Sequence, residues 1–377
     1  TINGTGHSSG GAIIFTANDN TYSGAITLGA TSTIVSTGGA QTISGTTYGG
    51  HALNITANDN LVISGLVGAY VSGDIFNELT TYSVTVTGSG TLTYSANITT
   101  TGNQTHTAAG GIVTSGARIF ISSGGTVNFA SALSGDNNLS VIGHVDIDGA
   151  ITGIGAFYIG GAYRSVTITS NSPIGANITS TDTITFIGTV TLTSNVTLTS
   201  TNDNILIAGA VNSSDSTRRN LTIDTGGNTA VVMTSGAWGG VNPLGEIVIT
   251  GALDLNAVVT DITSISVSGV SNICCWITAT GTQTYSGTVT LSGTDDYINL
   301  TGTTIQFAAV DGAKNLRITG NLDLNGAITE IGTLRVTGTS NIGANVTTTG
   351  TQIYSGAVTL STNATLTSSN DNFTFSD

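Results

Sequence analysis

The sequence predicts an all-β protein that folds as a parallel β-solenoid, and three observations lead to this fold class. Gly, Thr, Ser and Asn make up 193 of the 377 residues, whereas the residues that favour helices are scarce. Short runs such as Val190–Leu192 and Val196–Leu198 alternate apolar and hydroxyl side chains, as strands with one buried face do. Internal repeats recur through the chain, which is typical of architectures built from stacked units.

The repeats fall into three kinds of element. Residues 171–209 align without gaps on 339–377, and 20 of the 39 positions are identical. The sequence GTQTYSGTVTL at 281–291 returns as GTQIYSGAVTL at 350–360. A third element begins LDLN in residues 253–269 and 322–338, and residues 145–161, which begin VDID, are similar to it.

Turn residues decide between the architectures that many short strands can build. Gly, Asn, Asp and Ser separate the strands at intervals of six to ten residues, as they do in turns. A propeller would show a clean repeat of about 40–50 residues, and a sandwich would use tight hairpins as regular connectors. A solenoid with coils of about 20–24 residues fits best, as one continuous domain over 1–377. The alternation places the following side chains inside it: Val190, Leu192, Val196, Leu198, Val358, Leu360 and Leu366.

Residues 347–371 and 311–338 resemble the β-strand-repeat segments of very large secreted bacterial proteins. They are similar to the shafts of filamentous-haemagglutinin-like adhesins. This resemblance implies a right-handed parallel β-helix at the cell surface or outside the cell, with a structural or adhesive role. The Asn-Pro motifs of the secretion domain that usually leads such proteins are missing, since the one Asn-Pro, Asn242-Pro243, lies mid-chain.

Charge and hydropathy exclude several partners. The formal net charge is −14, with seven basic residues and no basic stripe, which argues against binding nucleic acid or an anionic membrane surface. The sequence contains no run of about 18 apolar residues, the length that a membrane-spanning helix needs, so we expect no membrane-spanning segment. Because residue 1 is Thr and no leader precedes it, we expect a processed product or a segment of a longer protein.

Catalytic and metal-binding patterns are weak, so we expect no enzymatic activity and no cofactor. The densest acids, Asp146/Asp148 and Asp295/Asp296, suit solvated rows better than the paired carboxylates of a glycosidase. Each of the four Asn-Asp-Asn triplets could stabilise a turn or, alternatively, ligate Ca²⁺. Cys274 and Cys275 are adjacent, and on a strand one thiol would be buried and the other exposed. A vicinal disulfide and an interchain bridge are the alternatives.

Two segments, 66–82 and 236–246, interrupt the strand pattern. Each is either a longer turn packed against a coil or a loop that leaves the solenoid to bind a partner. A glycan-binding or glycan-cleaving β-helix is the alternative function, and its ligand-contact aromatics would be Tyr70, Tyr163 and Trp238. Rows of alternating Thr suggest ice binding as a further alternative.

The two ends of the sequence read as strands without a polar cap. Apolar side chains at both ends could therefore form an end-to-end interface that produces a filament or a longer shaft. Glycans and host or cell-surface molecules are the other expected partners. The interface residues that this interpretation names are Ile2, Ile13, Phe15, Phe373 and Phe375.

Overall fold

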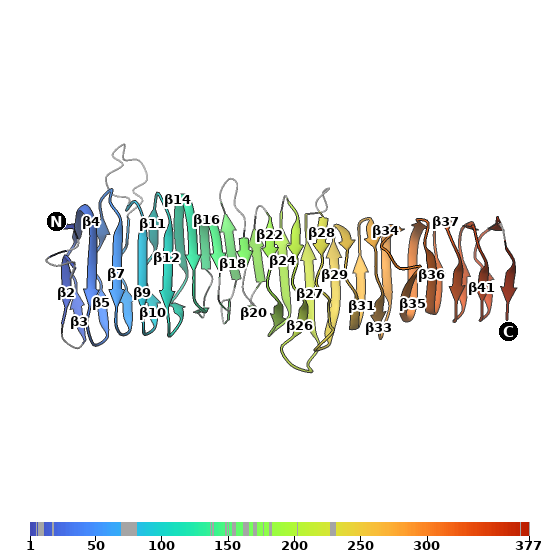
Figure 1. The fold of residues 1–377 in the computed structure, drawn as a ribbon, viewed down its shortest axis with the longest axis horizontal. Helices are drawn as coiled ribbons and strands as arrows, with labels where there is room; N and C mark the ends of the chain where they lie inside the picture. The colour runs from blue at the N-terminus through green and yellow to red at the C-terminus, as the bar shows by residue number, and fades with distance from the viewer. Residues whose placement is uncertain are drawn as a thin grey trace. The chain divides into compact units, whose positions relative to one another are not determined.

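The structure is a computed structural model, and it divides into two compact units, Thr1–Ile184 and Thr185–Asp377. Each unit is a parallel β-solenoid, as predicted, and the two units together contain about 15 turns (Figure 1). That residues 1–377 form one continuous solenoid stays a prediction. The structure describes residues 1–4, 6, 11–16, 19–68, 81–135, 137, 139–147, 149, 151–152, 156–160, 166–168, 172–175, 177–180, 183–201, 203–226, 231–369 and 371–376.

The elements of the first unit are short strands, and its described residues include no helix. They are β1 (Ile2–Gly4), β2 (Ile13–Phe15), β3 (Asn20–Tyr22), β4 (Ile26–Ser36), β5 (Gln41–Ile43), β6 (Thr47–Tyr48), β7 (Leu53–Ala57), β8 (Leu61–Ile63), β9 (Val84–Gly88), β10 (Leu92–Tyr94), β11 (Ile98–Thr100), β12 (Gln104–Ala108), β13 (Ile112–Thr114), β14 (Arg118–Phe129), β15 (Leu133–Gly135), β16 (Leu139–Ile147), β17 (Ile151–Thr152), β18 (Ala156–Gly160), β19 (Val166–Ile168), β20 (Ser172–Ile174) and β21 (Asn177–Ser180).

The second unit follows the same plan over its described residues, and β22 (Ile184–Phe186) lies at the boundary between the units. Its further strands are β23 (Val190–Leu192), β24 (Val196–Ser200), β25 (Ile205–Ile207), β26 (Val211–Ser213), β27 (Arg219–Asp224), β28 (Val231–Thr234), β29 (Leu244–Thr250), β30 (Ala252–Leu255), β31 (Val259–Val267), β32 (Ser271–Ile273), β33 (Ile277–Ala279), β34 (Gln283–Leu291), β35 (Tyr297–Asp311), β36 (Asn315–Leu324), β37 (Ile328–Ile331), β38 (Leu334–Val336), β39 (Ser340–Ile342), β40 (Val346–Thr348), β41 (Gln352–Tyr354), β42 (Val358–Leu360), β43 (Leu366–Ser368) and β44 (Phe373–Phe375).

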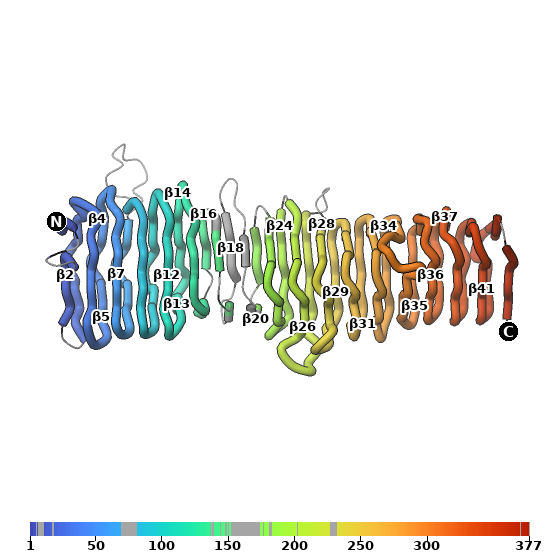
Figure 2. The backbone as a smooth tube through the Cα atoms, viewed as in Figure 1, coloured from blue at the N-terminus to red at the C-terminus, as the bar shows by residue number. Residues whose placement is uncertain are grey.

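Like residues stack on like residues from coil to coil, which gives each unit an apolar interior. In the first unit, Leu61, Leu92, Ile112, Leu133 and Ile151 follow one another in parallel register, and each is at most 3% exposed. The tube in Figure 2 shows the chain winding through successive coils in each unit. Because every strand of this column buries a branched aliphatic side chain, hydrophobic burial stabilises each added coil.

The second unit contains equivalent columns. Leu300, Ile318, Val336 and Tyr354 are in parallel register and fully buried. Phe375 continues this column on β44.

Coil length varies more than the expected 20–24 residues. Register partners are 18 residues apart at Leu322 and Ser340 but 31 apart at Leu53 and Val84. The turns absorb this difference because they lie outside the strand ladders, so the buried columns stay aligned.

The predicted inward positions of β23 and β24 are confirmed. Val190, Leu192, Val196 and Leu198 are at most 3% exposed. The prediction is wrong for the burial of Leu360, which is 54% exposed, and Val358 and Leu366 are only half-buried.

Leu360 is exposed because of the position of β42 in the stack of coils, and not because its side chain lies on the outer face of the strand. It lies in register with the buried Ile342, and among the described residues no strand pairs with the other edge of β42.

Asparagine amides support the corners of successive coils. Asn315 Oδ1 accepts a hydrogen bond from the backbone N–H of Thr333 at 2.7 Å, and Asn321 Oδ1 does the same for Thr339 at 2.9 Å. The donor lies one coil later in each case. This satisfies backbone groups that the strand ladders leave unpaired, and it explains why Asn is abundant between the strands.

Glycines stack at the corners where successive coils approach most closely. A Cβ at Gly287 would lie 2.3 Å from the carbonyl oxygen of Gly269, and a Cβ at Gly269 would lie 2.5 Å from that of Gly251. Both distances are too short for van der Waals contact, so backbone would have to shift. The Ser-Gly and Thr-Gly dipeptides that punctuate the repeats therefore permit the close approach of coils.

Replacing Gly287 with alanine is expected to destabilise the second unit by about 1–3 kcal/mol, the usual cost of overpacking. The reason is the clash of the new Cβ with the carbonyl of Gly269. Urea denaturation followed by circular dichroism measures the effect. The matched control is Ser286→Ala at the exposed neighbouring position, which should leave the midpoint unchanged. Equal midpoints for the Gly287 variant and the wild type would contradict the prediction.

Candidate functional site

The prediction that Trp238 is an exposed aromatic side chain available to a ligand is wrong. Its side chain is 1% exposed, and its backbone forms parallel bridges with Val211 and Val259. Trp238 therefore takes an inward position in a strand ladder, where its large apolar ring fills the interior of the coil. Tyr70 and Tyr163 lie outside the described residues.

The turn that follows Trp238 packs against its own coil. The amide oxygen of Asn212 accepts a hydrogen bond from the backbone N–H of Val241 at 2.9 Å. Asn242 Nδ2 donates to the carbonyl of Ser213 at 3.0 Å, and Ser213 Oγ donates to the carbonyl of Pro243 at 2.6 Å. Segment 236–246 is thus a longer turn held by side chains of the preceding coil. Of the segment 66–82, residues 69–80 lie outside the described part of the chain.

The apolar residues proposed for an end-to-end interface lie on outer coils of separate units. Ile2, Ile13 and Phe15 are half-buried on β1 and β2. Phe373 is 41% exposed and Phe375 is 57% exposed on β44. An apolar face is therefore accessible at β44, in the second unit.

A polar cluster lies inside the first unit at β10 and β12. The hydroxyl of Tyr94 donates a hydrogen bond to His106 Nδ1, and His106 Nε2 donates to Gln104 Oε1 at 3.3 Å. The rings of Phe120 and Phe129 lie 5.5 and 5.4 Å from the imidazole centroid. Both nitrogens of a neutral imidazole therefore have partners in an otherwise apolar interior.

Burial changes the titration of this cluster. Desolvation lowers the pKa of His106 to about 3 and raises the pKa of Tyr94 well above its ordinary value, because each charged form loses its hydration. Both residues are therefore neutral at physiological pH. Their uncharged, hydrogen-bonded state indicates a structural role.

The second unit repeats this arrangement with tyrosine in place of histidine. Tyr285 Oη donates to Gln283 Oε1 at 2.9 Å, and Tyr354 Oη donates to Gln352 Oε1 at 3.0 Å. Each glutamine amide in turn donates to backbone carbonyls of its own coil and of the next one; for Gln283 these are Ile277 and Thr301. The repeated Gln-x-Tyr sequence is therefore an interior hydrogen-bonding element. Its recurrence at 283–285 and 352–354 is the feature of the sequence from which this element could have been predicted.

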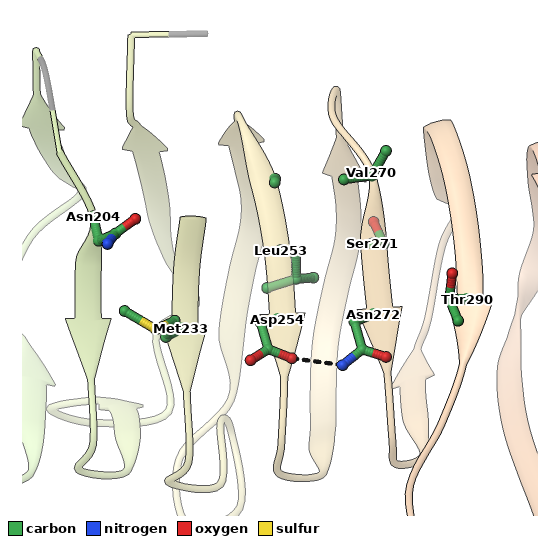
Figure 3. A pocket seen from close by; sticks show the side chains of 9 residues that line it. Asn204, Met233, Leu253, Asp254, Val270, Ser271, Asn272 and Thr290 are labelled. Atoms are coloured by element: carbon green, nitrogen blue, oxygen red, sulfur yellow. Dashed lines mark hydrogen bonds between the residues drawn. The ribbon is translucent and has the colours of Figure 1, made fainter. Parts of the chain in front are cut away.

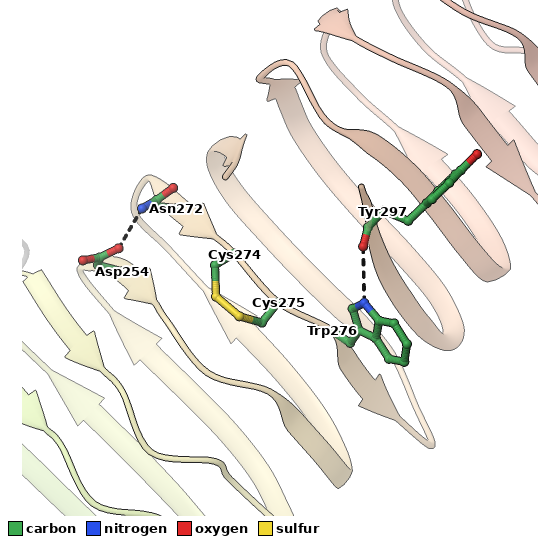
Figure 4. Close-up of a disulfide and its surroundings, with 6 residues drawn as sticks. All are labelled: Asp254, Asn272, Cys274, Cys275, Trp276 and Tyr297. Carbon is green, nitrogen blue, oxygen red and sulfur yellow. Dashed lines mark hydrogen bonds between the residues drawn. A yellow bond between two sulfur atoms is a disulfide. The ribbon is translucent and has the colours of Figure 1, made fainter. Parts of the chain in front are cut away.

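Cys274 and Cys275 form a vicinal disulfide (Figure 4). The prediction of two thiols on opposite faces of a strand is wrong. The cysteines follow β32 at a corner of the coil, where the alternation of a strand ends. The next residue, Trp276, is 49% exposed, and its indole N–H donates to the carbonyl of Tyr297 at 3.2 Å. Tyr297 is itself 43% exposed. Sequence reasoning missed this aromatic corner.

A groove of about 370 Å³ lies on the outer side of the second unit across β28, β30, β32 and β34 (Figure 3). Met233, Asp254, Asn272 and Thr290 follow one another in parallel register along it. Asn272 Nδ2 donates to Asp254 Oδ1 at 2.7 Å. The groove thus combines apolar walls with a carboxylate and an amide, and sequence reasoning did not single it out.

Acidic side chains elsewhere mainly support turns. In the Asn-Asp-Asn triplets, Asp59 and Asp203 accept the backbone N–H of the following asparagine at 2.7 Å, and Asp371 does so at 2.9 Å. Asp146 Oδ2 accepts from Asn128 Nδ2 at 3.3 Å, and Asp148 lies outside the described residues. Within the described part of the chain, no group of three or more His, Cys, Asp or Glu could hold a metal ion.

A comparison of the chain with protein-family models, with curated proteins and with solved structures finds no match. The parallel solenoid implied by the resemblance is confirmed. A relationship to adhesin shafts stays a prediction. Over the residues that the structure describes, no helical segment has the length and apolarity that a membrane crossing requires.

Proposed function

We propose that this chain is a non-enzymatic structural protein of an extracellular or cell-surface fibre, in which coil stacks assemble end to end or continue a longer shaft. A parallel solenoid suits this role because every coil offers the next one a complete set of backbone hydrogen-bonding groups and an apolar column. Adhesion and secretion from bacteria belong to the same proposal. They are supported by the resemblance to adhesin shafts.

The accessible face of the last described coil carries the proposal. Phe373 and Phe375 on β44 stand in register with Gln352 and Tyr354, which are fully buried one coil earlier. The ring of Phe375 stacks on that of Tyr354 with centroids 5.4 Å apart, while its other face is open. One more coil placed on this edge would bury side chains of the kind that the interior already contains.

A double substitution tests end-to-end assembly. We expect the wild-type chain to form concentration-dependent assemblies in sedimentation velocity and filaments in electron micrographs. The Phe373→Asp/Phe375→Asp variant should stay monomeric, because two carboxylates would lose their hydration in the contact.

Thr374→Asp is the matched control on the same strand, since Thr374 is exposed on the alternating face. It should assemble as the wild type does. A wild-type chain that is monomeric at every concentration would overturn the assembly, and so would a double variant that assembles like the control.

A further inference from the structure

Two copies of the LDLN element differ in the hydrogen bonds that their aspartate carboxylate accepts. In the later copy, Asp323 Oδ1 accepts from Asn341 Nδ2 at 2.9 Å and Asp323 Oδ2 accepts from Gln306 Nε2 at 3.0 Å. Gln306, Asp323 and Asn341 are in register on three successive coils. Both carboxylate oxygens of this copy therefore have amide donors from the neighbouring coils.

The earlier copy lacks one of these donors. Asp254 Oδ1 accepts from Asn272 Nδ2, but the residue in register on the other side is Met233, whose thioether has no hydrogen to donate. From the described residues, Asp254 Oδ2 receives no hydrogen bond. Figure 3 shows this oxygen turned toward Met233, at the groove.

The groove around this oxygen has the composition of a small-ligand site. Ala252, Met233 and the exposed Val270 supply apolar contact, and Asn272 and Thr290 add polar groups beside Asp254. Its volume of about 370 Å³ lies within the range of pockets that hold small molecules. The carboxylate disfavours an anionic ligand. It favours a ligand that places a hydrogen-bond donor where the amide of Gln306 lies beside Asp323 in the other copy of the element.

We propose that this groove binds a saccharide, with one ring hydroxyl donating to Asp254 Oδ2 and the C–H face of the pyranose against Met233 and Val270. A pyranose suits the site because it presents an apolar face and a hydroxylated edge at once. A second hydroxyl reaches the amide of Asn272, which lies on the next strand. This binding is independent of coil assembly, because the groove lies on the outer side of the sheet.

Saturation-transfer NMR with neutral methyl glycosides tests the proposal on the intact chain. The probes are the methyl glycosides of glucose, galactose, mannose and N-acetylglucosamine at millimolar concentration, with butylamine as a cationic probe. At least one glycoside should receive saturation from the wild-type protein. Transfer to butylamine without transfer to any glycoside would overturn the proposal in favour of a cation site, and absence of transfer to every probe would overturn it as well.

The copy of the element that contains Asp323 suggests a variant that tests the hydrogen bond to Asp254. Met233→Gln places in the groove the amide donor that Gln306 provides in the other copy, so it should satisfy Asp254 and keep the coil folded. We expect it to weaken glycoside binding by about tenfold or more, which is the change in Kd that corresponds to the loss of one charge-assisted hydrogen bond. Asp323→Asn, at the matched aspartate, should leave binding unchanged. Equal glycoside binding by the wild type and by a folded Met233→Gln variant would overturn the proposal.

Discussion

Replacing Leu198 with aspartate is expected to unfold the coils around β24 and to cause the largest loss of stability among the substitutions considered. Leu198 is 2% exposed and in register with the fully buried Ile223 on β27. The change removes about 2 kcal/mol of hydrophobic burial and adds the cost of an unpaired buried carboxylate, several kcal/mol more. The sum is comparable to the whole stability of a typical domain. Urea denaturation followed by circular dichroism provides the measurement.

Two further variants keep this experiment decisive. Thr197→Asp places the same charge one residue earlier, on the half-buried outward face, and should shift the midpoint little. Leu198→Ala creates a cavity without a charge and should cost about 2–5 kcal/mol, so it remains measurable if the aspartate variant does not fold. The inward assignment of Leu198 would be wrong if the Asp variants at 197 and 198 unfolded at the same urea concentration.

Acidification is expected to destabilise the first unit through His106. Burial lowers the pKa of His106 to about 3, whereas in the unfolded chain the group titrates near its ordinary value of 6.5. Between these values the unfolded state binds a proton that the folded state does not bind. The contribution of His106 to stability is therefore complete above about pH 6.5 and falls by up to about 1.4 kcal/mol per pH unit as the pH decreases toward 3.

Urea denaturation at several pH values between about 7 and about 5 measures this slope, since few carboxyl groups titrate in that interval. The His106→Gln variant replaces the imidazole with an amide that does not titrate and can still accept from Tyr94. It should lose most of the pH dependence, whereas His51→Gln, at an exposed histidine, should keep it. A wild-type slope retained in His106→Gln would show that other groups cause the acid sensitivity.

The local pattern of the sequence was sufficient to predict the fold class and much of the interior. Alternation with a period of two places every second side chain of a strand on the same face, so Val190 to Leu198 could be assigned from neighbouring residues alone. The repeats added the information that coils stack, since copies of one element must occupy equivalent places. These properties depend on residues close together in the chain, which a sequence displays directly.

The tertiary structure decided which residue of one coil meets which residue of the next. Trp238 was assigned to an exposed loop, yet it lies buried between Val211 and Val259 because its turn returns to the ladder. The groove depends on Met233, not a glutamine, standing beside Asp254. These partners are 21 residues apart, whereas Asp254 and Asn272 are 18 apart. Since irregular turns set these separations and carry no period of their own, the contacts between coils emerge only when the chain is folded.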